Sequence, residues 1–215
     1  MGMTSEQVQE YLEAYLNNLR ALNMQEENID LLKSSLKIAR VKSKDTLINP
    51  GEICRNVYLV IEGGFVCRYI HEKNGEAKTI NFYLPDLHPV MACLDSYFAQ
   101  VPTECELKAI GDSIAVGLPK SVIDVLIAKD PGYAKYYHEV VSTAMTEENE
   151  VKTKLIAYSS KEKYEFVVRE MPSVIQKVPS KYIAEFCGIS PEWLSKLKKK
   201  KWFKRENYSP AHFLN

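Results

Sequence analysis

The stretch from Val178 to Lys201 holds side chains whose types and spacing suit contacts with a polyanion. Within it, Ile183 and Phe186 fall on one face of a short amphipathic helix. We expect Ser180 to cap that helix, and we expect Gly188 to end it because glycine adopts the left-handed conformation at low cost. The pattern therefore predicts the first helix of a two-helix unit.

A second helix start follows at once, where Ser190 can act as the cap and Pro191 can fill the first helical position. Leu194 and Leu197 share the buried side of this second helix, and its other faces are polar, basic or aromatic. Such side chains bind phosphate oxygens and the edges of bases. The candidate DNA-binding residues are Ser180, Lys181, Ser190, Glu192, Trp193, Ser195, Lys196, Lys199 and Lys200.

The residues from Val178 to Leu197 resemble the C-terminal helix-turn-helix of the Crp/Fnr family of bacterial transcription regulators. The resemblance is greatest to the branch found in Bacteroidetes-type bacteria. The shared features are Pro179, the pair Ile183-Ala184 and the turn Gly188-Ile189-Ser190. The resemblance implies a homodimer that binds a palindromic site in double-stranded DNA through the second of the two helices.

Two residues of the second helix depart from the family pattern. Trp193 replaces a small polar residue, and Lys196 stands where an arginine usually contacts a guanine. Arginine can bind guanine with two parallel hydrogen bonds, whereas lysine acts as a point charge. These two differences therefore affect which base the second helix would select at the positions it contacts.

The charged residues are distributed unevenly, although the 215-residue chain has 28 basic and 28 acidic residues. The segment from Val178 to Arg205 holds eight basic residues and two acidic ones, which leaves the rest of the chain with an excess of acids. A basic end on an otherwise acidic protein suits a polyanionic partner at that end. No apolar run reaches membrane-spanning length, and the polar, acidic start is unlike a secretion signal. We expect a cytoplasmic protein without a membrane partner.

The cysteines show no pattern typical of a disulfide framework or a zinc site. They are odd in number, widely spaced and without a C-x-x-C pair. We therefore interpret them as small buried apolar side chains. The five residues are Cys54, Cys67, Cys93, Cys105 and Cys187.

From Ile38 to Leu118 the sequence changes to short runs rich in β-branched and aromatic residues. Turn signals separate these runs, and Asn74-Gly75 is a strong hairpin signal. Closely spaced short strands predict an antiparallel, jelly-roll-like β-roll. The run Asn49-Pro50-Gly51-Glu52 and the run from Tyr58 to Gly63 are also similar to the effector-sensing β-roll of the Crp/Fnr family, so the resemblance covers nearly the whole chain.

The segment 82–104 corresponds to the phosphate-binding turn of family members that bind cyclic nucleotides. Those members hold the phosphate with backbone N–H groups and an arginine. Here the segment contains no arginine and no glycine, but it contains Asp86, Asp95 and Glu104. These carboxylates would repel a phosphate, so we do not expect cyclic AMP as the effector.

An unidentified small-molecule effector would need another kind of pocket, and aromatic residues of the predicted β-roll are the candidates. Residues of this type more often fill a core than line a pocket. The candidate pocket residues are Tyr69, Phe82, Tyr83, Tyr97 and Phe98. No cofactor or metal is expected, because no two of the four histidines are close enough in sequence to supply a metal-binding motif.

Beyond Pro131 the sequence predicts a long helix with an apolar seam that follows a heptad spacing over three heptads. The family dimerises through a long helix at this place, so we expect the seam to face a second copy of the chain. The alternative is an ordinary helix that packs on its own β-roll. The seam consists of Tyr137, Val141, Ala144, Glu148, Val151, Leu155 and Tyr158.

The expected fold class is α+β, with three parts. N-terminal helices and a cyclic-nucleotide-binding-like β-roll sensor domain occupy residues 1–130, a dimerisation helix occupies 131–158, and a winged-helix-type helix-turn-helix domain occupies 159–215. A capping box at Ser159 and Glu162 starts a new helix after Tyr158, which places a hinge there. The tail 202–215 receives no role.

The sequence therefore predicts a DNA-binding transcription regulator of the Crp/Fnr type. The alternative is a ligand-binding signalling module whose helix-turn-helix no longer reads DNA. An enzyme is not expected, because no nucleophile–base pair or metal cluster is recognisable. RNA polymerase and an unidentified effector are candidate partners.

Overall fold

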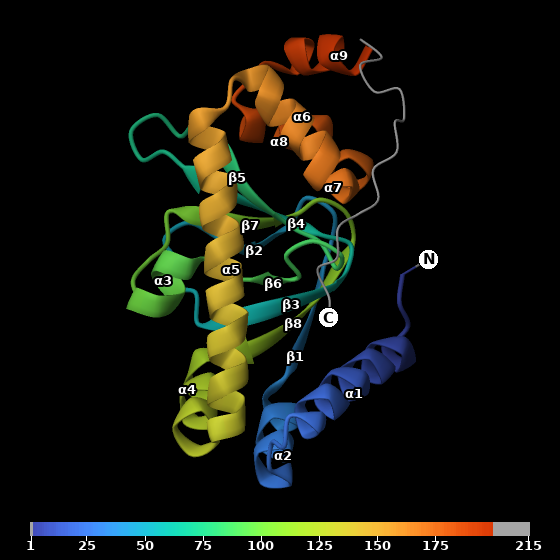
Figure 1. Cartoon of the computed structure of the whole chain (residues 1–215), viewed down its shortest axis with the longest axis vertical. Helices are drawn as coiled ribbons and strands as arrows, with labels where there is room; N and C mark the ends of the chain where they lie inside the picture. Colours follow the sequence, from blue (N-terminus) through green and yellow to red (C-terminus); the bar gives the residue numbers. More distant parts are fainter. Residues whose placement is uncertain (1, 200–215) are drawn as a thin grey trace.

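The computed structural model describes residues 2–199, and these form a β-roll with helices at both ends and one long helix along its side (Figure 1). The elements in chain order are α1 (Ser5–Ala21), α2 (Glu26–Ser35), β1 (Lys37–Val41), β2 (Thr46–Ile48), β3 (Asn56–Glu62), β4 (Phe65–Ile70), β5 (Ala77–Tyr83), β6 (Val90–Met91), α3 (Leu94–Ala99), β7 (Cys105–Ala109), β8 (Ser113–Pro119), α4 (Lys120–Lys129), α5 (Pro131–Ala157), α6 (Ser160–Glu170), α7 (Pro172–Lys177), α8 (Ser180–Cys187) and α9 (Pro191–Lys199).

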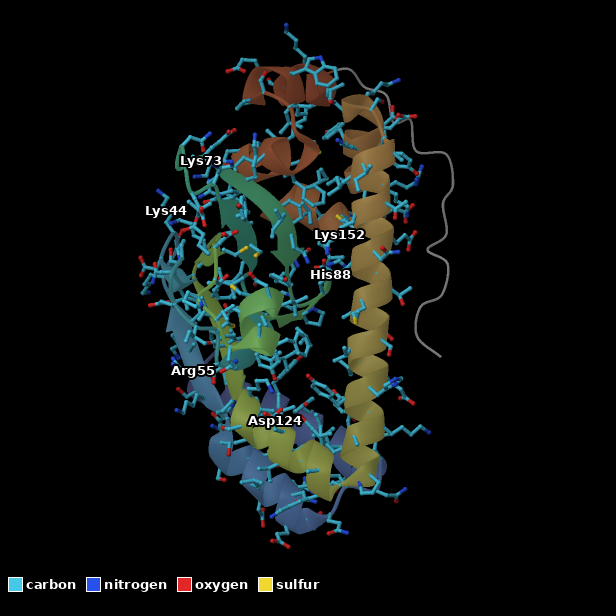
Figure 2. The ribbon with its side chains drawn as sticks, turned by 90° about the vertical axis from the view of Figure 1, so that its left-hand side faces the viewer. Lys44, Arg55, Lys73, His88, Asp124 and Lys152 are labelled. Carbon is cyan, nitrogen blue, oxygen red and sulfur yellow. The ribbon has the colours of Figure 1, made fainter. Side chains whose placement is uncertain are left out.

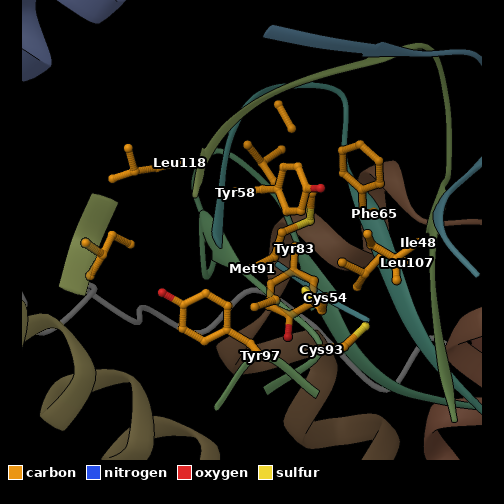
Figure 3. Packing of buried hydrophobic residues seen from close by; sticks show 14 of the residues in the cluster. Ile48, Cys54, Tyr58, Phe65, Tyr83, Met91, Cys93, Tyr97, Leu107 and Leu118 are labelled. Carbon is orange, nitrogen blue, oxygen red and sulfur yellow. The ribbon is translucent and has the colours of Figure 1, made fainter. Parts of the chain in front are cut away.

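The β-roll consists of two antiparallel sheets of four strands each, which confirms the predicted α+β fold class. One sheet has the order β1-β8-β3-β6 and the other the order β2-β7-β4-β5. Strands that alternate between apolar and polar residues bury one face each, and here those faces meet between the sheets. Figure 3 shows the packed interior, where Phe65, Leu107 and Met91 are almost inaccessible to solvent.

Helix α1 covers the first sheet and begins at a capping box, in which Thr4 and Gln7 satisfy each other's backbone N–H groups. Its apolar residues Val8 and Leu12 pack against Ile114 and Val116 of β8. Leu16 and Leu19 of the same helix extend the main core. Because these contacts bury the solvent side of that sheet, the N-terminal helices belong to the roll.

Helix α5 is 27 residues long, which corresponds to about 40 Å, and it runs along the roll from α4 to α6 (Figure 1). Asp130 caps its start by accepting a hydrogen bond from the backbone N–H of Tyr133 at 2.9 Å. The same carboxylate accepts a hydrogen bond from the amide of Asn28 at 2.9 Å, so it also ties α5 to α2. Burial raises the pKa of Asp130, but the hydrogen bonds from Asn28 and from the backbone N–H groups of Tyr133, Gln25 and Gly132 together hold it below its usual value.

The predicted break after Tyr158 is present, since α5 ends at Ala157 and α6 begins at Ser160. The predicted capping box is confirmed, because the hydroxyl of Ser159 and the carboxylate of Glu162 each accept a backbone hydrogen bond from the other residue. Helices α6 to α9 then form the C-terminal part. The expected wing and the tail 202–215 lie outside the described residues. Among residues 2–199, no helix is both long and apolar enough to cross a membrane.

The turn between β3 and β4 requires a glycine, because Gly63 adopts a φ of +73° there. A Cβ atom at Gly63 would lie 2.5 Å from the carbonyl oxygen of Asp112 and 2.8 Å from the Cα atom of Ser113. We expect Gly63→Ala to lower the free energy of unfolding by about 2 to 4 kcal/mol, measured by urea denaturation. Gly75→Ala is the matched control, since Gly75 has a φ of +67° but open space around it. We expect Gly75→Ala to lower the free energy of unfolding by about 1 kcal/mol. Equal losses for the two variants would contradict the predicted clash at Gly63.

Candidate nucleic-acid interface

Helices α8 and α9 form a helix-turn-helix whose turn has the predicted geometry. Gly188 has a φ of 66° and ends α8, as expected. Its N–H donates to the carbonyl oxygen of Glu185 at 3.1 Å, and the N–H of Ile189 donates to that of Ala184 at 3.0 Å. These two bonds satisfy the last carbonyl groups of α8, so the chain leaves the helix in a fixed direction.

The predicted cap of α9 is confirmed, whereas the predicted cap of α8 is wrong. The hydroxyl of Ser190 accepts a hydrogen bond from the backbone N–H of Trp193 at 3.1 Å. At α8, however, the capping residue is Pro179, and Ser180 is already the first helical residue. The hydroxyl of Ser180 instead accepts a hydrogen bond from Nζ of Lys198 at 2.6 Å, which ties the start of α8 to the end of α9.

The apolar sides of the two helices face inward as predicted. Ile183 and Phe186 of α8 and Leu194 of α9 are buried. Helix α8 is buried on more than one side, because Tyr182, Ala184 and Cys187 are also inaccessible. Helix α8 therefore lies between other elements, and α9 is the outer helix at this end of the molecule (Figure 1).

The candidate DNA-binding side chains are exposed wherever the structure describes them. Ser180, Lys181, Ser190, Glu192, Ser195 and Lys196 lie open to solvent, and Trp193 is 40% exposed. A hydrogen bond from Ser190 lowers the pKa of Glu192, so this carboxyl group is ionised and can only accept hydrogen bonds. Lys199 lies in α9, but its side chain and the whole of Lys200 are outside the description.

The inner helix α8 docks on the β-roll through an ion pair with Arg68 of β4. The Nε and Nη2 atoms of Arg68 each lie 3.1 Å from one oxygen of Glu185 on α8, so the pair is bidentate. Thr79 of β5 donates a further hydrogen bond to Glu185 at 2.8 Å. Nη1 of Arg68 binds Glu106 at 2.6 Å, and the guanidinium group lies over the ring of Tyr182.

Apolar and polar contacts next to this ion pair also join the two parts. The rings of Phe82 on β5 and Phe186 on α8 lie 4.8 Å apart between their centroids. Asp86, one of the acids of segment 82–104, accepts a hydrogen bond from Ser173 at 2.6 Å and binds Lys177 at 2.9 Å. Local sequence patterns gave no sign of these contacts, because the partners are about 90 or more residues apart.

The predicted seam of α5 lies partly against the chain's own β-roll, as in the alternative considered for the sequence. Tyr137 packs on the main core, whereas Val151, Leu155 and Tyr158 pack on the cluster shared with α6 and α8. Glu148 accepts a hydrogen bond from Asn81 of β5 at 2.5 Å. Val141 is half-buried and Ala144 is exposed. Figure 2 shows His88 on the roll side of α5, where its Nε2 lies 3.6 Å from Glu147.

The five aromatic residues considered for an effector pocket are divided between different surroundings. Phe82 belongs to the cluster with Phe186, whereas Tyr83 and Tyr97 are buried in the main core (Figure 3). Tyr69 is half-buried at the edge of that core, and Phe98 is 53% exposed. Two of the five therefore fill the packed interior of the β-roll, while Phe82 fills the contact between the roll and α8.

The pair between Arg68 and Glu185 should contribute to stability because both side chains are largely shielded, with exposed fractions of 16% and 24%. We expect a double-mutant cycle with Arg68→Met and Glu185→Gln to give a coupling energy of about 1 to 3 kcal/mol in urea denaturation. The matched control is the exposed pair of Lys42 and Asp112, for which we expect no measurable coupling energy. Equal coupling energies in the two cycles would refute a special role for the shielded pair.

Comparison with known proteins gives solved structures of the same fold but no close relative in sequence. No protein-family model matches the chain, and no curated protein sequence is similar enough to count as a relative. FixK2 from Bradyrhizobium japonicum matches with a TM-score of 0.65 and 14% identity over 77% of this chain and 83% of that one. A candidate transcriptional regulator of the Crp/Fnr family from Eubacterium rectale matches with a TM-score of 0.62 and 16% identity over 81% and 82% of the two chains.

A third similar structure is the c-di-GMP responsive global regulator CLP from Xanthomonas campestris. It matches with a TM-score of 0.62 and 11% identity, over 82% of this chain and 91% of that one. Each of the three matches covers more than three quarters of this chain. The chain therefore has the fold of the Crp/Fnr transcription regulators.

Proposed function

We propose that this protein is a DNA-binding transcription regulator of the Crp/Fnr type, which binds double-stranded DNA through α9. The observation that carries the proposal is the division of α9 into two faces. Leu194 is buried against α8, while Glu192, Trp193, Ser195 and Lys196 face solvent on a helix fixed at its start by the Ser190 cap. A helix of this kind can enter the major groove of DNA with its start nearest the bases.

Each exposed residue has a contact that suits its chemistry. Ser195 and Lys196 occupy the positions nearest the base edges, and Glu192 can accept a hydrogen bond from the amine of a cytosine. Trp193 can pack on a thymine methyl group or on the sugar backbone. Ser180 and Lys181, at the start of α8, are proposed to bind phosphates, and the lysines that follow α9 in sequence add attraction that depends on salt.

We also propose that two copies of the chain form a dimer along α5. The roll covers one side of this helix, and no helix or strand of residues 2–199 lies on its other side in Figure 2. That open side holds Met145, which is 65% exposed, and Ile156, which is 86% exposed, with the half-buried Val141 in line with them. A second copy is the occupant that a palindromic site requires, because two recognition helices must then lie about one turn of DNA apart.

The proposed parts are a sensor domain over residues 1–130, a dimerisation helix over 131–158 and a DNA-binding domain over 159–215. The effector is proposed to differ from cyclic AMP, because the acidic segment 82–104 offers no arginine for a phosphate. Among similar structures, CLP is described as c-di-GMP responsive and CprK as complexed with OCPA, so the fold accommodates different ligands. A role at bacterial DNA implies a cytoplasmic protein, with RNA polymerase as a candidate partner.

The alternative is a signalling module whose helix-turn-helix no longer reads DNA, and Trp193 and Lys196 are the residues that favour it. The experiment that separates the two passes sheared genomic DNA over the purified protein at moderate salt and sequences the retained fragments. Recovery of a palindromic motif with half-sites roughly 10 base pairs apart would support the regulator. If no motif is recovered, a screen of ligands in the same assay tests whether an effector is required.

Lys196 provides the sharpest test of the proposed DNA contact. We expect Lys196→Glu to weaken binding to the recovered motif at least about tenfold, since it places a negative charge against the DNA in both copies. Fluorescence anisotropy with a labelled duplex gives the affinity, and analytical ultracentrifugation checks that assembly is unchanged. Lys135→Glu is the matched control at the distant end of α5, where Lys135 is exposed. Equal affinities for Lys196→Glu and the unchanged protein would favour the alternative.

The open side of α5 is tested separately from DNA binding. We expect Ile156→Asp to weaken self-association at least about tenfold, because a carboxylate would have to be desolvated in the interface. Sedimentation velocity over a range of protein concentrations measures the change. Ile38→Asp is the matched control, since Ile38 is 41% exposed on β1. A dimer that Ile156→Asp leaves intact would place the interface elsewhere.

A further inference from the structure

A groove of about 580 Å³ crosses the junction between the roll and α7. On the roll side it is lined by Ile61 at the end of β3, by Pro85 and by Ile110 in the turn before β8. Lys177 of α7 lines the other side. Ile61 is only 6% exposed, and Pro85 and Ile110 are half-buried, so apolar side chains form much of the wall. A groove of this kind suits an occupant that carries apolar side chains.

The N-terminal segment forms a further wall, which other parts of the roll fix in place. The backbone N–H of Met3 donates a hydrogen bond to the carboxylate of Glu62 at 2.6 Å, and Arg40 donates one to the carbonyl oxygen of Met3 at 3.4 Å. Gln7, which also lines the groove, belongs to the capping box of α1. The groove is therefore preformed, and an occupant would not have to order its walls first.

We propose that the groove is the docking site of the chain's own C-terminal segment 206–215, which thereby straps the end of α9 to the roll. The inference goes beyond the proposed function, because it concerns a contact within one chain and does not depend on DNA binding. The composition, the reach and the charge of the segment suit the groove.

The character of the sequence changes at Arg205. The basic residues after α9 end there, and residues 206–215 contain neither lysine nor arginine. This segment instead carries Tyr208, Phe213 and Leu214. Large apolar side chains gain free energy when they leave water, whereas the phosphates of DNA attract only cations. The segment therefore needs an apolar surface and not the polyanion that attracts the preceding lysines.

The end of α9 lies close enough for this segment to reach the groove. Nζ of Lys198 donates a hydrogen bond to the hydroxyl of Ser180 at 2.6 Å, so the last turn of α9 lies beside the start of α8. Ser180 follows Lys177 by three residues, so their Cα atoms are at most about 11 Å apart. Residues 200–206 can span up to about 25 Å. That length covers the three residues and the one lysine side chain that separate α9 from the groove wall.

The charge at the α7 side of the groove also matches the segment. Lys177 binds Asp86 at 2.9 Å, but its side chain remains 45% exposed. Glu206 is the first residue of the segment and its one acidic residue, so it meets Lys177 where the chain enters the groove. Phe213 and Leu214 follow and cover the apolar wall.

The experiment replaces Phe213 in the full chain with the photo-crosslinking residue p-benzoylphenylalanine. We expect irradiation to link position 213 to peptides that contain Met3, Ile61 or Ile110, which mass spectrometry identifies after digestion. Phe98 replaced in the same way is the matched control, since Phe98 is 53% exposed on α3 and does not line the groove. It should give no link to these peptides.

A second variant fills the groove without strain in the fold. Gly111 lines the groove, and a Cβ atom there would meet no atom of a distant residue within 4 Å. We expect Gly111→Trp to reduce the yield of links from position 213 at least about tenfold. Ser121→Trp is the matched control, because Ser121 is exposed on α4 and does not line the groove, and it should leave the yield unchanged. Circular dichroism checks that both variants are folded.

A mixture of chains with light and heavy nitrogen shows which copy supplies the segment. We expect the two peptides of each link to carry the same isotope. Links between different isotopes would overturn the proposal in favour of a second copy as the source. Absence of links from position 213 to the groove would overturn it outright, and this result does not depend on the folding of Gly111→Trp.

Discussion

The position of the helix-turn-helix depends on the ion pair that joins Arg68 of β4 to Glu185 of α8. A planar guanidinium group binds a carboxylate through two parallel hydrogen bonds only in one orientation, so the pair fixes α8 in direction as well as in distance. Glu106 binds the remaining side of Arg68, and Lys108 lies 3.9 Å from Glu106. Two positive and two negative charges therefore balance one another in a shielded place. Removal of α8 would leave this group with an excess positive charge, which is costly away from water.

The long helix α5 packs on the roll with one side and is exposed on the other, which explains its uneven pattern of residues. Its roll side must satisfy polar groups of the sheet, and Glu148 does so by accepting a hydrogen bond from Asn81. This contact accounts for a charged residue in the middle of an otherwise apolar seam. The outer side holds Met145 and Ile156, large apolar side chains without a covering element in the described residues. The heptad spacing of the seam thus reflects packing within one chain as well as any packing between chains.

Local patterns were sufficient to predict the elements, because caps, turns and periodicity are properties of neighbouring residues. Gly188 and Ser190 have the predicted conformation and cap, and the alternating runs became strands of the β-roll. Ser180 was misassigned because proline can itself occupy the capping position, which frees the hydroxyl for Lys198. Contacts between distant segments were not predictable in this way. Arg68 and Glu185 are 117 residues apart, so no periodicity relates them.

The cysteines agree with the interpretation drawn from the sequence, since all five are free and buried. The segment 82–104 shows more clearly what contacts between distant parts of the chain add to the local patterns. Phe82 packs on α8, Asp86 binds α7, and Tyr97 adjoins α5. In the cyclic-nucleotide-binding members that this sequence resembles, the same segment holds a phosphate. Here it is attached at three points to α8, α7 and α5, so the segment holds the elements that position α9 in place of a phosphate.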